Sequence, residues 1–143
     1  RKTKKISEMK KYLYFIFVWV FALSLTSCED DDQYSIESVI IGRAWTGDVG
    51  MYAENGEPIF STFTFWGDGF GEEYQYYSYD GAPYDNFRFK WLWEDDYNNN
   101  LILDYGRAGM SYMDDVRVTG NQLRGTFFLT SDSRGFNFIL GME

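Results

Sequence analysis

Short runs of aromatic and β-branched residues, separated by glycine, asparagine and aspartate, most constrain the fold of this 143-residue chain. Strands that alternate with turn signals about every 8–12 residues are typical of an all-β sandwich or barrel. The one helical feature that we expect after the N-terminal region is a short turn at Ile36 to Ile41. We expect eight strands, at residues 44–52, 59–66, 71–79, 84–93, 100–105, 111–118, 122–130 and 134–141.

Apolar and polar side chains alternate within several of these runs. In the fourth run, with Leu92 as an exception, the aromatic residues share one face and the polar residues the other: Phe87, Phe89, Trp91 and Trp93 against Asn86, Arg88 and Lys90. The last two runs repeat this alternation at Leu123, Phe127, Leu129, Phe136, Phe138 and Leu140. Side chains two residues apart lie on the same face of a strand, so one face of the sheet must be buried. We predict an antiparallel up-and-down barrel of about eight strands, because closure removes exposed edges.

The N-terminal region has the layout of an export signal. Six basic residues precede an uncharged apolar run over residues 12–25, which is shorter than the roughly 20 residues that span a bilayer as a helix. The next residues, Leu25-Thr26-Ser27-Cys28, resemble the lipobox of bacterial lipoproteins at each of its four positions. That resemblance implies cleavage before Cys28 and acylation of its thiol. Met9-Lys10-Lys11 would be a natural start for a compact signal that ends before Cys28.

Four acidic residues, Glu29 to Asp32, follow this cysteine. Like charges repel one another, so the simplest interpretation is an extended linker. The alternative is a sorting signal, since the patch resembles the surface-export signal of Bacteroidetes lipoproteins. We therefore expect a signal peptide at 1–27, an acidic linker at 28–40 and a β-barrel domain at 41–143. The expected location is the outer membrane, anchored by lipid, with surface exposure left open.

Two short motifs suggest a family for the barrel. Gly42-Arg43-Ala44-Trp45-Thr46-Gly47 opens the first predicted strand, and the aromatic second strand runs into the turn Gly67-Asp68-Gly69. Together they resemble the lipocalin-like lipoproteins of Bacteroidetes, which are small β-barrels of mostly unknown function. True lipocalins carry Gly-x-Trp, whereas two residues separate Gly42 from Trp45 here. The resemblance therefore implies a fold, and it assigns no ligand-binding residues.

The composition excludes several functions. The chain has no histidine, and its one cysteine would be consumed by the lipid, which removes histidine-based catalysis and imidazole-ligated zinc sites. Residues 28–143 hold 21 acidic and seven basic residues, a net charge of −14 that disfavours nucleic acid as a partner. We expect a non-enzymatic protein with no cofactor, metal or catalytic residue. The acidic loop at 94–100 has oxygen ligands suited to calcium, but an ordinary hairpin loop explains it more simply.

Aromatic residues make up 21% of the chain, more than a small core requires, and they suggest binding. Tyrosine and tryptophan combine a flat apolar surface with a polar group, which suits an apolar or sugar-like ligand or a partner protein. The alternative function is a carboxylate-dependent glycoside hydrolase, since that chemistry needs only two acids. Its candidate acids are Asp68, Glu72, Asp104, Asp114 and Asp115. The candidate binding residues are Trp45, Trp66, Tyr76, Tyr77 and Trp91.

Overall fold

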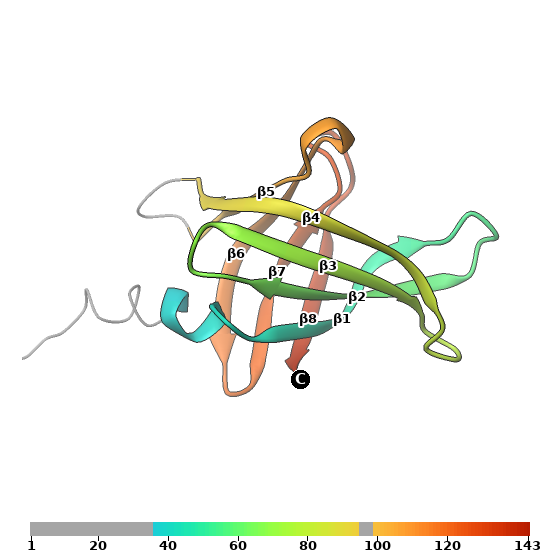
Figure 1. Cartoon of the computed structure of the whole chain (residues 1–143), viewed down its shortest axis with the longest axis horizontal. Helices are drawn as coiled ribbons and strands as arrows, with labels where there is room; N and C mark the ends of the chain where they lie inside the picture. Colours follow the sequence, from blue (N-terminus) through green and yellow to red (C-terminus); the bar gives the residue numbers. More distant parts are fainter. Residues whose placement is uncertain (1–35, 95–98) are drawn as a thin grey trace, which may run out of the picture. The chain divides into compact units, whose positions relative to one another are not determined.

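The computed structural model describes residues 36–94 and 99–143, where the runs of aromatic and β-branched residues form eight antiparallel strands. Each strand pairs with the next along the chain, and β8 returns to pair with β1, which closes the barrel (Figure 1). A single 3-10 turn, η1 (Gly106–Ala108), joins the fifth strand to the sixth. The strands are β1 (Ala44–Tyr52), β2 (Pro58–Phe65), β3 (Phe70–Tyr77), β4 (Pro83–Trp93), β5 (Leu101–Asp104), β6 (Met110–Thr119), β7 (Gln122–Phe128) and β8 (Phe136–Met142).

This architecture confirms the predicted all-β fold, an up-and-down barrel of eight strands. Every predicted strand is present, and its ends lie within two residues of the predicted ones. The short turn expected at Ile36 to Ile41 is a helical turn over residues 36–40. Its last residue, Ile40, is fully buried in the core, so part of the predicted linker at 28–40 packs as part of the barrel.

The barrel unit comprises Ile36–Glu143. It closes on itself and buries a core of its own, which are the properties of a domain that folds alone. The predicted signal peptide, Cys28 and the acidic residues after it lie outside the described residues. Over the ranges that the structure describes, no helix is long and apolar enough to cross a membrane.

The predicted alternation sets which side chains fill the barrel. In β4, Phe89 and Trp91 are buried, whereas Arg88, Lys90 and the exceptional Leu92 are exposed. In β7 and β8 the apolar residues near the barrel centre are buried as expected. Near the ends of the same strands, Leu129 and Phe136 are 49% and 37% exposed. The interior is therefore filled unevenly along the barrel axis.

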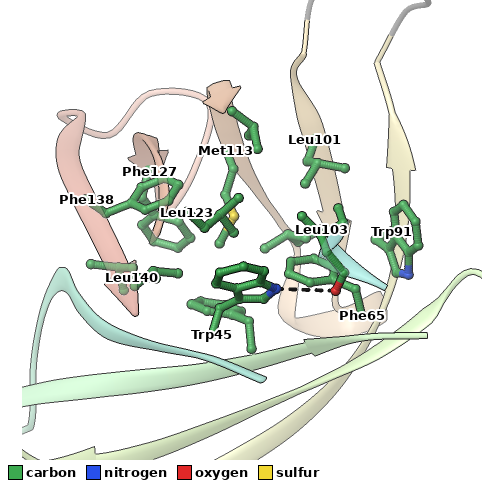
Figure 2. Close-up of a cluster of buried hydrophobic side chains, with 14 of the residues drawn as sticks. Trp45, Phe65, Trp91, Leu101, Leu103, Met113, Leu123, Phe127, Phe138 and Leu140 are labelled. Atoms are coloured by element: carbon green, nitrogen blue, oxygen red, sulfur yellow. Dashed lines mark hydrogen bonds between the residues drawn. The ribbon is translucent and has the colours of Figure 1, made fainter. Parts of the chain in front are cut away.

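The well-filled end is the one where β1 begins and β2 ends. Trp45 is completely buried there, and its indole Nε1 donates a hydrogen bond to the carbonyl oxygen of Ile40 at 3.3 Å (Figure 2). The Trp91 indole Nε1 lies 3.0 Å from each of two carbonyl oxygens, those of Trp66 and Phe70. Each buried indole thus packs its ring and satisfies its N–H group. Around them lie Phe65, Leu101, Leu103, Met113, Leu123, Phe127, Phe138 and Leu140 (Figure 2).

One glycine makes this packing possible. Gly71 of β3 faces inward beside Phe89 of β4, and a Cβ atom at this position would lie 2.4 Å from the Phe89 ring. The ring therefore occupies the space that any larger side chain would need. Phe89 in turn packs edge-on against Phe63 and Phe65, with centroids 6.4 and 5.7 Å apart. The missing side chain lets three aromatic rings meet inside a narrow barrel.

Replacement of Trp45 by alanine tests the importance of the filled end. We expect Trp45→Ala to lower the free energy of unfolding by about 3–5 kcal/mol, because it leaves a large cavity. The matched control Trp66→Ala, whose side chain is 37% exposed in the turn after β2, should cost less than about 1 kcal/mol. Guanidinium chloride unfolding of residues 33–143, followed by circular dichroism, measures both. Equal losses would contradict this description of the core.

Candidate functional site

A cavity of about 390 Å³ occupies the opposite end of the barrel, where β1, β3, β5 and β7 end. It opens among the loops that follow these strands, and it has both apolar and polar walls. The apolar side chains are Met51, Ile59, Phe87, Ala108, Phe127 and Leu129. The polar ones are Tyr52, Glu73, Gln75, Tyr84, Asp85, Tyr105, Ser111 and Thr130.

The carboxylate of Glu73 is the most buried charge in this lining. Its residue is 3% exposed, and three neutral side chains donate hydrogen bonds to it. The Ser61 hydroxyl and the Gln75 amide both reach Oε2, at 2.7 and 3.1 Å. The Tyr105 hydroxyl reaches Oε1 at 2.6 Å. A carboxylate offers about four acceptor positions, so the donors among the described residues leave one position on Oε1 for a further donor.

Strand register explains how these groups meet. Glu73 and Gln75 are two residues apart on β3, so both point into the barrel. On β2, Ser61 lies opposite Gln75 and Phe63 lies opposite Glu73. Tyr105 follows β5, and its ring packs against Phe87 and Phe89 of β4, with centroid distances of 6.1 and 5.4 Å. Glu73 and its three hydrogen-bond donors therefore lie between the packed core at the filled end of the barrel and the cavity.

No basic side chain compensates the Glu73 charge within the described ranges. The ion pair found there, between Arg117 and Asp115, is exposed, and the cavity lining contains neither lysine nor arginine. Burial, the charge of Glu73 and the hydrogen bond to it raise the pKa of the Tyr105 hydroxyl well above its ordinary value. Tyr105 therefore remains a protonated donor over the neutral pH range. Over the part of the chain that the structure describes, neutral donors hold this charge inside the barrel.

The five aromatic residues predicted to bind a ligand lie outside the cavity lining. Trp45 and Trp91 are buried at the filled end, and Trp66 lies in the turn after β2. Tyr76 faces outward and shares a hydrogen bond with Thr46. Tyr77 comes nearest, because its ring packs 5.5 Å from that of Tyr84, which does line the cavity. The structure does not bring the five together.

The polar residues of the cavity were missed at the sequence level, and the tyrosine run in β3 explains why. In β3 the inward positions before Tyr77 hold Gly71, Glu73 and Gln75, so the polar pair lies between tyrosines that face outward. Tyr74 lies outside and is 50% exposed. The available signal was Glu73 and Gln75 at a spacing of two in a strand.

The acids proposed for hydrolysis lie on turns and outer surfaces. Asp68 and Asp104 accept hydrogen bonds from the backbone N–H groups of Phe70 and Gly106, two residues further on. Burial, followed by the charge of Glu94, raises the pKa of Asp114. Asp115 pairs with Arg117, and Glu72 lies opposite Thr64 and Arg88 in the sheet.

The acidic loop considered for calcium lies partly outside the described residues, at 95–98. Over the described part of the chain, no group of three or more metal-ligating side chains occurs.

Comparison with protein-family models, with curated proteins and with solved structures found no match to this chain.

Removal of the Tyr105 hydroxyl tests the buried network. Tyr105→Phe should lower the free energy of unfolding by about 1.5–3 kcal/mol, because the buried carboxylate loses a donor. Tyr79, which is 66% exposed, provides the control. Tyr79→Phe should change stability by less than about 0.5 kcal/mol. Denaturant unfolding at pH 7 compares the two, and an unaffected Tyr105→Phe protein would refute the network.

Proposed function

We propose that this protein is a non-enzymatic, lipid-anchored protein of the cell envelope that binds a small, mainly apolar molecule at the open end of its barrel. The observation that carries the binding proposal is the cavity of about 390 Å³. Ligand sites are typically hollows of about 300–1,000 Å³ with largely apolar walls and a few polar groups that orient the ligand. This cavity at the open end of the barrel, which we call the mouth cavity, meets the description in its volume and in its lining residues.

The anchoring part of the proposal comes from the sequence. The lipobox-like residues Leu25 to Cys28, the basic and apolar segment before them and the acidic residues after them support acylation at Cys28. Each buried methylene group contributes about 0.8 kcal/mol, and two acyl chains suffice for a stable anchor. Lipoproteins with a lipobox carry three acyl chains at this position, so the resemblance implies an anchor that would hold the protein almost permanently at the outer membrane.

A carboxylate-dependent hydrolase is the second candidate, because two acids, Glu73 and Asp85, line the same cavity. Hydrolysis of a glycoside requires one of the two acids to donate a proton. Three neutral side chains direct their hydrogens toward Glu73, an arrangement that suits an acceptor. Asp85 is exposed at the rim. The geometry therefore supports binding better than catalysis.

A matched pair of methionine substitutions tests binding in the cavity. Met51 lines the cavity, whereas Met110 is 47% exposed and does not. Met51→Trp fills space in the cavity and should weaken binding of the neutral fluorescent probe N-phenyl-1-naphthylamine at least tenfold, an effect on the order of 1.4 kcal/mol. Met110→Trp should leave binding unchanged. Failure of the unmodified protein to bind the probe, or equal binding by both variants, would refute the proposal.

Replacement of the thiol tests the anchor. When cells are supplied with an alkyne-tagged palmitate analogue, the native protein should take up the tag and partition into the detergent phase. Cys28→Ser should abolish labelling, because a serine residue does not present the thiol that is acylated. Ser27→Ala provides the control, since alanine is a small residue and should preserve processing. Undiminished labelling and membrane retention of the Cys28→Ser protein would disprove lipid anchoring.

A further inference from the structure

We infer that the mouth cavity selects an organic cation, a molecule with a protonated amine and an apolar body. This inference rests on the proposed function, because it requires that the cavity bind small molecules. It specifies the chemical class of the ligand from the charge of the lining. The lining has two acids, Glu73 and Asp85, and among the described residues it has no base.

The buried position of Glu73 favours the binding of a positively charged ligand group deep in the cavity. Its carboxylate is almost completely buried, so its electrostatic interactions are stronger than those of a surface acid. Among the described residues, two side chains donate to Oε2, whereas Tyr105 alone donates to Oε1. An ammonium N–H group at the open position of Oε1 would make a charge-assisted hydrogen bond. A protonated amine would also supply the positive charge that the buried carboxylate lacks.

Aromatic rings beside this carboxylate add to the preference. Tyr105 donates to Glu73 and meets Phe87 edge to face, at 89° between the ring planes. Tyr84 also lines the cavity. The faces of aromatic rings carry negative electrostatic potential and attract cations, and the attraction grows when water is excluded. The same cavity would repel an anion, whose charge would have to approach Glu73 without a compensating base.

The described basic side chains, including Arg134 in the loop between β7 and β8, all lie outside the cavity lining. Arg88 and Lys90 alternate outward on β4 and line another hollow, which shares Tyr105 with the cavity, and the Lys90 ammonium lies 5.8 Å from the centre of the Phe70 ring. Arg107 is exposed in η1 and is not part of the cavity lining. No described residue of the lining therefore supplies a positive charge to Glu73, and a bound ligand would have to supply it.

Three eight-carbon probes of similar shape test the inference: octylamine, 1-octanol and octanoate. Calorimetric titration of residues 33–143 at pH 7 should show octylamine binding on the order of tenfold to a hundredfold more tightly than 1-octanol, as expected for one charge-assisted hydrogen bond. Octanoate should bind more weakly than the alcohol. The amine remains protonated at this pH, as a lysine side chain does.

Two isosteric substitutions on the same strand locate the preference. Glu73→Gln should remove the advantage of octylamine over 1-octanol, because the deep negative charge is lost. Glu72→Gln changes the net charge equally, but Glu72 lies on the outer face of β3, so the advantage should persist. Circular dichroism verifies that each variant is folded. If Glu73→Gln does not fold, the order of the three probes on the unmodified protein decides the question.

The outcomes separate the two proposals. Equal binding of octylamine and 1-octanol by the unmodified protein would overturn the cation preference and leave the binding function intact. A preference for the amine that survives Glu73→Gln would also overturn the inference, because the charge would then act elsewhere. If none of the three probes and no N-phenyl-1-naphthylamine bind, the proposed function itself fails.

Discussion

The buried carboxylate of Glu73 divides the interior of the barrel into two halves with different properties. On one side lies a close-packed core around Trp45 and Trp91, and on the other lies the cavity. A charge at this depth is unfavourable unless hydrogen bonds replace the water it has lost. Ser61, Gln75 and Tyr105 provide those hydrogen bonds, and the filled half fixes the strands that carry them. The positions of Glu73 and its three donors thus depend on the packing of the apolar core.

A buried carboxylate of this kind makes the barrel less stable than a well-packed apolar interior would. The reason is that a buried charge adds little to the free energy of unfolding, even when hydrogen bonds compensate it. A closed barrel that needed only a core could fill its second half with leucine or phenylalanine. Instead, the interior ends in a hollow whose deepest polar group is acidic. Taken with the lipobox-like segment, this arrangement suggests a receptor or carrier held close to a membrane. The tether would set where the cavity operates, and the carboxylate would set what enters it.

Much of the fold could be predicted from the sequence, because strand formation depends on local patterns. The turn signals set all eight strands to within two residues, and the alternation in β4 gave the correct inward face. The cavity could not be predicted in this way. It requires Glu73, Tyr84 and Tyr105 to meet, and they come from β3, from β4 and from the residues after β5. Aromatic residues drew attention as binding residues, yet Trp45 and Trp91 serve the core. The sequence pattern predicts which side chains of a strand face inward. Only the closed barrel determines which of these side chains meet in the interior.

Nuclear magnetic resonance mapping of octylamine on residues 33–143 tests the central claim most directly. If the amine binds beside Glu73, the largest shifts will fall on backbone amides of the cavity lining, such as Gln75, Ser111 and Leu129. The amides of Trp66 and Lys90, which lie outside that cavity, should change little. Shifts concentrated on the outer face of β3 and β4, with the cavity amides unmoved, would contradict a ligand site inside this barrel.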